Sequence, residues 1–163
     1  MEKPVLKIPK TKIEMLFDGL GIIAFLGSAV YVAQHWMGFP DIIPTHFGAN
    51  GKPDDWGSKH TIWILTAIGM LIWVGLSILE RFPHTYNYMN LTPENIENQY
   101  KIGRLLVNSL KNGMIFLFSY IQWKIIQVIE GSAVGLGSWF LPILLLITFG
   151  TVFGFIVYSI KKK

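Results

Sequence analysis

Four long apolar stretches alternate with short polar segments along the chain. Each approaches the ~20 residues that a helix needs to cross ~30 Å of hydrocarbon. They lie at about residues 18–37, 60–80, 106–128 and 138–160. The third stretch alone has charges well inside it, Lys111 and Lys124, whose long side chains we expect to reach the headgroups on opposite faces. The pattern predicts four transmembrane helices, with a re-entrant or interfacial helix as the alternative for the third.

The amino-acid composition also indicates a membrane protein. Hydrophobic residues make up 52% of the 163 residues and charged residues only 15%, whereas soluble domains usually carry about 25% charged residues. We therefore expect an all-α integral membrane bundle that forms one domain over residues 1–163. The chain contains no cysteine, which excludes disulfides, thiolate metal sites and cysteine nucleophiles.

The basic residues indicate how the bundle is oriented. All Lys and Arg residues except Lys52, Lys59 and Lys124 fall on one side of the four predicted helices. Because cytoplasmic loops carry the excess of basic residues, we expect both termini in the cytoplasm and residues 39–59 outside. The charges gather at the ends of apolar runs and do not alternate with aromatic residues along a helix. We therefore expect the lipid bilayer as the partner and no nucleic acid.

Small residues indicate where helices approach each other. Gly150 and Gly154 form a GxxxG spacing in the last predicted helix, and this spacing lets transmembrane helices pack closely. Ordinary packing within the chain is one interpretation, and a homodimer through these two glycines is the other.

The segment between the second and third stretches predicts a helix that starts outside the bilayer. Thr92, Pro93 and Glu94 supply a capping hydroxyl, a proline for the first turn and an acid near the positive end of the helix dipole. We expect the helix to start near Pro93 and to run on into the third crossing, with Arg104 and the polar residues before it in water. Residues 83–104 form either a solvated extension or a docking surface for a cytoplasmic partner.

The loop at residues 39–59 is the most distinctive polar segment. Asn50-Gly51 favours a turn with positive φ, and Pro53-Asp54 favours a second turn. Ser58 can cap the helix that follows. We therefore expect an ordered, turn-rich loop on the outer face.

The same loop carries a family resemblance. The run Ile43-Pro44-x-His46-Phe47-x-Ala49-x-Gly51-x-Pro53-Asp54-x-Trp56-Gly57-Ser58-Lys59 resembles the signature of the bacterial membrane family known as domain of unknown function 1648. SdpI-type toxin-immunity proteins share this domain. The resemblance covers about residues 21–79 and implies a protein of the bacterial cytoplasmic membrane. Two features depart from the family pattern: an acid at position 55, where many members carry a basic residue, and a chain shorter than the six-span SdpI-type proteins.

The loop also supplies the candidate site. We expect a polar centre, a turn, an interfacial anchor and a charge at the helix mouth, formed by His46, Asn50, Asp54, Asp55, Trp56 and Lys59. Three alternatives remain open. The loop could bind a metal, since His46, Asp54, Asp55 and His60 offer nitrogen and oxygen ligands. It could recognise an anion or a peptide through its lysines and turn amides, or it could be purely structural.

The sequence contains no catalytic signature. A GxSxG, HExxH, Walker or dinucleotide-binding motif is absent, so we expect neither an enzyme nor a cofactor. We place Asp18, Lys111 and Lys124 near the edges of the bilayer, which argues against a proton-coupled pump. We therefore expect a non-enzymatic immunity or sensor protein that recognises an extracytoplasmic ligand, with a peptide as the candidate. The alternatives are an auxiliary subunit of a transport complex and a metal-binding protein that uses His46 and Asp54.

Overall fold

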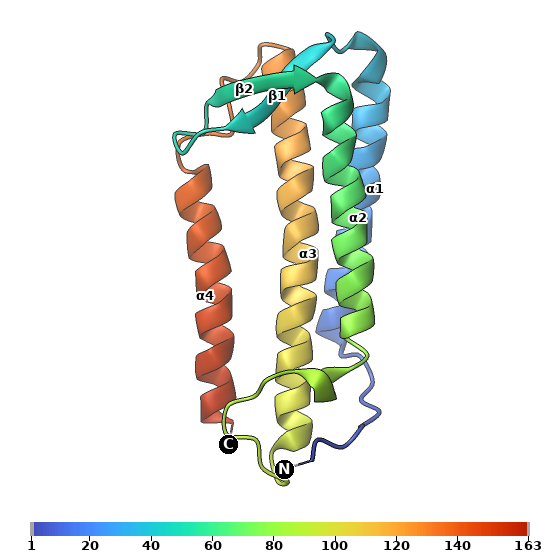
Figure 1. Cartoon of the computed structure of the whole chain (residues 1–163), viewed down its shortest axis with the longest axis vertical. Helices are drawn as coiled ribbons and strands as arrows, with labels where there is room; N and C mark the ends of the chain where they lie inside the picture. Colours follow the sequence, from blue (N-terminus) through green and yellow to red (C-terminus); the bar gives the residue numbers. More distant parts are fainter. Residues whose placement is uncertain (1, 163) are drawn as a thin grey trace.

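Four long helices and a small two-stranded sheet form the molecule, in a computed structural model that describes residues 2–162 (Figure 1). The long helices are α1 (Lys12–His35), α2 (Ile62–Leu79), α3 (Ile96–Ile129) and α4 (Phe140–Lys161). The strands are β1 (Ile42–Phe47) and β2 (Pro53–Ser58), and the short 3-10 helices are η1 (Trp36–Gly38), η2 (Lys59–Thr61) and η3 (Pro83–Thr85). The mostly helical fold was predicted correctly, but the loop before α2 is a β-hairpin, so the all-α class needs that correction.

Three helical segments are long and apolar enough to cross a membrane. They are α1 with η1 (Lys12–Gly38), η2 with α2 (Lys59–Leu79), and α4 (Phe140–Lys161), with 27, 21 and 22 residues. The third predicted crossing lies within α3, which has 34 residues but is more polar than the other three. These lengths and compositions support insertion into a membrane.

The helices stand side by side, and the two chain ends lie together. In Figure 1 both termini are at one end of the molecule and the hairpin is at the other. We call these the termini end and the hairpin end. Helices α1 and α2 pack closely against α3, whereas α4 contacts α3 less extensively. The connection between α1 and α2 therefore places the hairpin at the far end of both helices.

The N-terminus of α1 is fixed by a capping box. The Thr11 hydroxyl oxygen accepts a hydrogen bond from the Glu14 backbone N–H at 3.2 Å, and the Glu14 carboxylate accepts one from the Thr11 backbone N–H at 2.6 Å. This reciprocal pair satisfies backbone donors that the first turn of a helix leaves free. It starts the helix at Lys12, six residues before the predicted start of the crossing.

The hairpin turn was predicted correctly in one half and wrongly in the other. Gly51 has a φ of +75°, as the Asn50-Gly51 pair indicated. Pro53 and Asp54 were expected to form a second turn, but they begin β2, where Pro53 pairs with Phe47 in an antiparallel register. Proline is tolerated as the first residue of a strand because its missing N–H faces away from the partner strand there.

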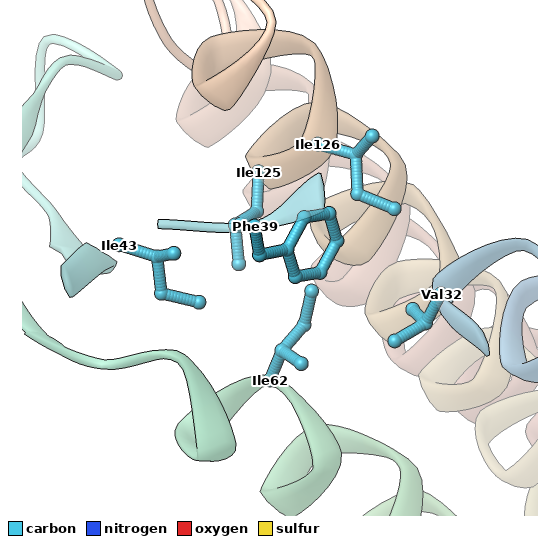
Figure 2. Close-up of a cluster of buried hydrophobic side chains, with 6 residues drawn as sticks. All are labelled: Val32, Phe39, Ile43, Ile62, Ile125 and Ile126. Carbon is cyan, nitrogen blue, oxygen red and sulfur yellow. The ribbon is translucent and has the colours of Figure 1, made fainter. Parts of the chain in front are cut away.

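A cluster of buried side chains holds the hairpin end together (Figure 2). It joins α1, β1, α2 and α3 through Val32, Phe39, Ile43, Ile62, Ile125 and Ile126. Val32, Ile43 and Ile126 have no exposed surface. Burying such a side chain stabilises the fold by about 1.5–3 kcal/mol. The base of the hairpin is therefore packed into the bundle core and contributes to its stability.

The start of α3 differs from the prediction at Pro93. The helix begins at Ile96, and the Asn95 side chain bridges the preceding turn by accepting from the Thr92 N–H at 2.9 Å and donating to the Asn90 carbonyl at 2.9 Å. Residues 93–95 thus form a turn that leads into the helix. Asn95 is the N-cap residue by position, but its side chain makes no hydrogen bond to the helix.

Helix α4 is the least integrated element. All of its residues are described, and none of them is buried. Gly150 and Gly154 line an open groove of about 680 Å³ beside α3, and no described atom of another element lies within 4 Å of a Cβ built at either glycine. The predicted GxxxG spacing therefore does not produce close helix packing within this chain.

Candidate functional site

The hairpin is held against the rest of the molecule at its tip as well as at its base. The Gly51 carbonyl accepts a hydrogen bond from the Leu136 N–H at 2.7 Å. A Cβ at Gly51 would collide with the backbone of Gly137, and one at Gly135 would collide with the backbone of Gly51. This close backbone contact joins the hairpin tip to the connection between α3 and α4. The candidate residues therefore sit on a platform that is fixed at two points.

His46 and Asp54 form the polar centre that the sequence predicted. The His46 Nδ1 lies 2.5 Å from the Asp54 Oδ1 across the two strands, with 68% and 51% of the side chains exposed. The contact with the carboxylate engages Nδ1, so Nε2 is the ring nitrogen left for a partner outside the chain. The pair can thus present an oriented imidazole to a ligand.

Asn50 and Asp55 make short local hydrogen bonds. The Asn50 side chain accepts from the Lys52 N–H at 2.9 Å, which closes the turn as predicted. The Asp55 carboxylate accepts from the Trp56 N–H at 2.9 Å. Both side chains remain exposed. Asp55 therefore retains oxygen lone pairs for a partner outside the chain.

Trp56 and Lys59 lie at different parts of the hairpin. Trp56 is 54% exposed on β2, opposite Pro44. Lys59 lies at the mouth of α2, as predicted, but it is occupied: its Nζ is 3.2 Å from Asp41 Oδ1 and 5.5 Å from the centre of the Trp36 ring. The structure thus brings His46 and Asp54 together, leaves Trp56 free on the surface, and assigns Lys59 to a separate contact at the base.

The hairpin does not assemble the four ligands considered for a metal. His60 packs against the Trp36 ring, at 5.2 Å between centroids, and its Nδ1 lies 3.0 Å from the Ser58 hydroxyl, which caps η2. Within residues 2–162, no group of three His, Asp or Glu side chains has the spacing of a metal site. His46 and Asp54 therefore remain a pair.

A second polar cluster, which the sequence interpretation missed, lies inside the bundle near the termini end. Lys111 was expected to reach toward the headgroups, but its side chain is 0% exposed. Its Nζ lies 2.8 Å from Asp18 Oδ1 on α1 and 2.6 Å from Glu80 Oε1 at the end of α2. The expected snorkelling of Lys111 was wrong, because carboxylates on two neighbouring helices supply the partners that the headgroups and water would otherwise provide.

Two asparagines complete this cluster on the same face of α3. Asn108 donates to Asp18 Oδ1 at 2.8 Å and to Glu80 Oε1 at 3.1 Å, and Asn112 donates to Asp18 Oδ1 at 3.1 Å. The Asn112 oxygen in turn accepts from the Trp73 indole N–H at 3.2 Å. Residues 108, 111 and 112 are three and four apart, the spacing that puts side chains on one helix face. This spacing of polar residues is the feature of the sequence that could have revealed the buried cluster.

Arg104 joins α3 to the N-terminal arm, which comprises residues 2–11. The Arg104 side chain pairs with Glu14 at 2.7 Å and also donates to the Ile8 and Pro9 carbonyls at 2.6 and 2.7 Å. Arg104 was expected to be in water, but only 4% of it is exposed. The guanidinium has five N–H donors, and it stays buried because a carboxylate and two carbonyls accept from it.

The charges of the buried cluster are balanced by the N-terminal arm. Lys10 Nζ lies 2.5 Å from Asp18 Oδ2 and 2.8 Å from Glu80 Oε2, so two lysines face two carboxylates. Burial by itself lowers the pKa of Lys10, but the contacts with Asp18 and Glu80 outweigh it and raise that pKa above its usual value. Unpaired charges inside a membrane protein are costly, and here each of the four charges has two partners of opposite sign.

Comparison with known proteins assigns the hairpin segment to a family. Residues 23–70 match the family model described as "Domain of unknown function (DUF1648)". This match confirms the predicted family for the segment that contains the second half of α1, the hairpin and the first half of α2. The buried charges at residues 10, 18, 80 and 111 lie outside it.

One curated relative adds no assigned activity. An "Uncharacterized protein" of Archaeoglobus fulgidus is 30% identical over 84 residues, which cover 44% of this chain and 46% of the relative. The chain thus spans about half the length of the curated relative it matches. No solved structure matches the chain.

Proposed function

We propose that this chain, whose residues 23–70 carry a DUF1648 segment, is a non-enzymatic receptor of the bacterial cytoplasmic membrane that binds an extracytoplasmic peptide through its hairpin. Four helices cross the membrane in this proposal, with both termini in the cytoplasm. The role is that of a sensor or of an immunity protein, which would bind a membrane-active peptide. Three apolar helices and the excess of basic residues at the termini end support the orientation.

The crossing by α3 is supported by where its polar residues lie. Arg104, Asn108 and Lys111 are all buried against α1, α2 or the arm. The exposed side chains of the same helix farther along include Phe116 and Trp123. A helix that directs its polar groups to partners and its apolar groups outward suits lipid, although its mean hydropathy is low.

One observation carries the receptor proposal: the hairpin is fixed at base and tip, yet its polar and aromatic side chains are exposed. His46 and Asp54 form a pre-oriented polar pair, Asp55 retains free lone pairs, and Trp56 offers an exposed aromatic surface. A two-stranded sheet also has outer edges whose backbone groups can pair with an extended peptide. This combination fits a peptide with basic and apolar side chains.

A peptide-display screen on the purified protein in lipid nanodiscs tests this function. A library of random peptides is selected on the wild-type chain, and enriched peptides are then measured against Asp55→Ala and Trp56→Ala. Removing one contact of this kind should weaken binding about tenfold, equivalent to ~1.4 kcal/mol. Asn98→Ala, exposed at the opposite end, is the control and should bind like wild type. If no peptide is enriched, or the hairpin variants bind every enriched peptide normally, the receptor function is wrong.

An auxiliary role in a transport complex is the second candidate, and the buried charges favour it. Ionisable residues inside a helical bundle frequently mark ion or substrate pathways. The partner surfaces in this case are residues 83–104, where Glu94, Glu97 and Asn98 remain exposed, and the open groove beside Gly150 and Gly154, which suits a second copy of the chain. Stoichiometric co-purification of a larger membrane protein, lost in the Glu97→Ala variant, would favour this candidate over the receptor.

A further inference from the structure

The buried charge cluster alternates in sign around a closed ring. Asp18 and Glu80 each use one oxygen for Lys111 and the other for Lys10, with nitrogen–oxygen distances of 2.5 to 2.8 Å. The ring joins α1, the end of α2, α3 and the N-terminal arm. Each carboxylate therefore has two ammonium partners, one on a helix and one on the arm.

Lys10 differs from the other three members of the ring. Its side chain is 40% exposed, against 16% for Asp18, 1% for Glu80 and 0% for Lys111. It also belongs to residues 2–11, which form neither helix nor strand. Helices hold the other three in place, whereas Lys10 reaches its partners from an irregular segment. It is therefore the most exposed member of the ring and the one that no helix holds.

A cavity lies where the arm meets the helices. Its volume is about 790 Å³, and its lining includes the arm residues 5–10 together with Trp73, Ser77 and Glu80. Glu80 is 2% exposed, and its Oε2 is a buried oxygen that forms no hydrogen bond of good geometry among the described residues, although Lys10 lies 2.8 Å away. The site thus has acceptor capacity that the lysine of the arm does not use fully.

We propose that Asp18 and Glu80 form a binding site for a primary ammonium group, that Lys10 occupies it as a ligand built into the chain, and that a free primary amine can take the place of the Lys10 side chain. Without Lys10, two buried carboxylates face one buried lysine. The unbalanced charge must then be neutralised, because an uncompensated charge inside the bundle is strongly destabilising. A primary ammonium group fits because it has three donors for the carboxylate oxygens that Lys10 would leave.

The other contacts of the arm explain why it stays close to the site. Lys3 Nζ donates to the Tyr86 carbonyl at 2.5 Å, and the Tyr100 hydroxyl donates to the Pro4 carbonyl at 3.2 Å. Arg104 holds the Ile8 and Pro9 carbonyls. Truncating Lys10 alone therefore leaves the arm in place and opens a space of the size of its side chain next to the two carboxylates.

Chemical rescue of Lys10→Ala tests the site directly. The variant is purified in detergent, and its thermal unfolding is followed with ethylammonium chloride or with tetramethylammonium chloride at equal ionic strength. We expect Lys10→Ala to unfold at a lower temperature than wild type and ethylammonium to restore it saturably. Tetramethylammonium has no N–H donor and should not restore it. Lys7→Ala, in the same exposed arm, is the matched control and should respond equally to both salts.

Thiol labelling in the cavity tests the same site without relying on a change in the unfolding temperature of Lys10→Ala. Ser77→Cys places a thiol in the cavity of a chain that has no cysteine. A cationic ethylammonium thiosulfonate should label Ser77→Cys about tenfold faster when Lys10→Ala is also present, as expected for an attraction of ~1.4 kcal/mol. An anionic sulfonate reagent of similar size should show no such gain.

Two results would overturn the proposal. One is equal stabilisation of Lys10→Ala by both ammonium salts, which would indicate screening by salt and no site. The other is a labelling rate at Ser77→Cys that rises equally for the cationic and the anionic reagent, which would indicate a general opening of the cavity. Neither result depends on whether the hairpin binds a peptide.

Discussion

Lys111 of α3 lies 2.6 Å from Glu80 at the end of α2, with both side chains almost completely buried. Asp18 of α1 completes the contact at 2.8 Å from the same nitrogen. This arrangement joins the termini ends of the two helices whose opposite ends carry the hairpin. The charge of Lys111 is therefore part of the bundle interior.

Replacing Lys111 should destabilise the protein severely. Lys111→Met leaves Asp18 and Glu80 buried with Lys10 as their one remaining cationic partner in the cluster, and breaking a buried ion pair in this way typically costs ~3–5 kcal/mol. Thermal unfolding in detergent would measure the loss. Lys124→Met is the control, because Lys124 is half-buried near the opposite end of the same helix and contacts Gln127. Equal stability of the two variants would show that the buried cluster does not hold the helices together.

Arg104→Lys should release the N-terminal arm despite the retained charge. A lysine cannot form the two-point contact with Glu14 and reach the Ile8 and Pro9 carbonyls as well. The lost hydrogen bonds to a charged group are each worth ~1.5–3 kcal/mol, so trypsin should cleave the arm much faster.

Limited proteolysis of membranes with the termini side exposed provides the measurement. Arg81→Lys, at an exposed position near the same end, serves as the comparison and should be cleaved at the rate of wild type. Unchanged cleavage of the Arg104→Lys arm would mean that the arm is held by other contacts.

Gly51→Ala should undock the tip of the hairpin. The φ of +75° disfavours any side chain by roughly 1–2 kcal/mol, and the new Cβ would also collide with the Gly137 backbone. Gly131→Ala separates the two effects, because Gly131 has a φ of +73° but no described atom within 4 Å of its Cβ. We expect Gly51→Ala to lose more stability than Gly131→Ala and to expose the hairpin to proteolysis. Equal losses would show that the tip contact contributes nothing.

The contribution of Lys10 to stability should depend on pH at the alkaline end. Since the ring raises the pKa of Lys10, its contribution is complete below its usual value of 10.5 and is lost as the pH rises through the higher value of the folded protein. The difference in stability between wild type and Lys10→Met should thus stay constant from neutral pH to about 10.5 and then shrink. A difference that already declines near neutral pH would contradict the placement of Lys10 between two carboxylates.

The sequence was sufficient for the elements that depend on local pattern. Apolar runs of about 20 residues predicted the crossing regions of α1, α2 and α4, and Asn50-Gly51 predicted the turn with positive φ. The structure also places His46 and Asp54 in contact, while their role in a binding site stays a prediction. These features follow from spacing along one segment.

The sequence was insufficient where partners lie far apart in the chain. Lys111 meets Asp18 across 93 positions and Arg104 meets Glu14 across 90. Without the packing angles of α1 and α2 on α3, a lysine within an apolar stretch can equally extend to the headgroups or turn inward to an acid. The polar spacing of residues 108, 111 and 112 indicates a face but not its partner.

The most direct test of the proposed topology is to find on which side of the membrane the hairpin and the two ends of α3 lie. Because the chain has no cysteine, Ala49→Cys, Asn98→Cys and Val134→Cys can be labelled one at a time on intact cells with a membrane-impermeant thiol reagent. All three positions are exposed, at the hairpin, near the start of α3 and in the connection after it. The account predicts that Ala49→Cys and Val134→Cys are labelled and that Asn98→Cys is labelled only after the membrane is permeabilised. Equal labelling at Asn98 and Val134 would mean that α3 does not cross, and labelling of Asn98→Cys alone would place the hairpin in the cytoplasm and remove the extracytoplasmic ligand.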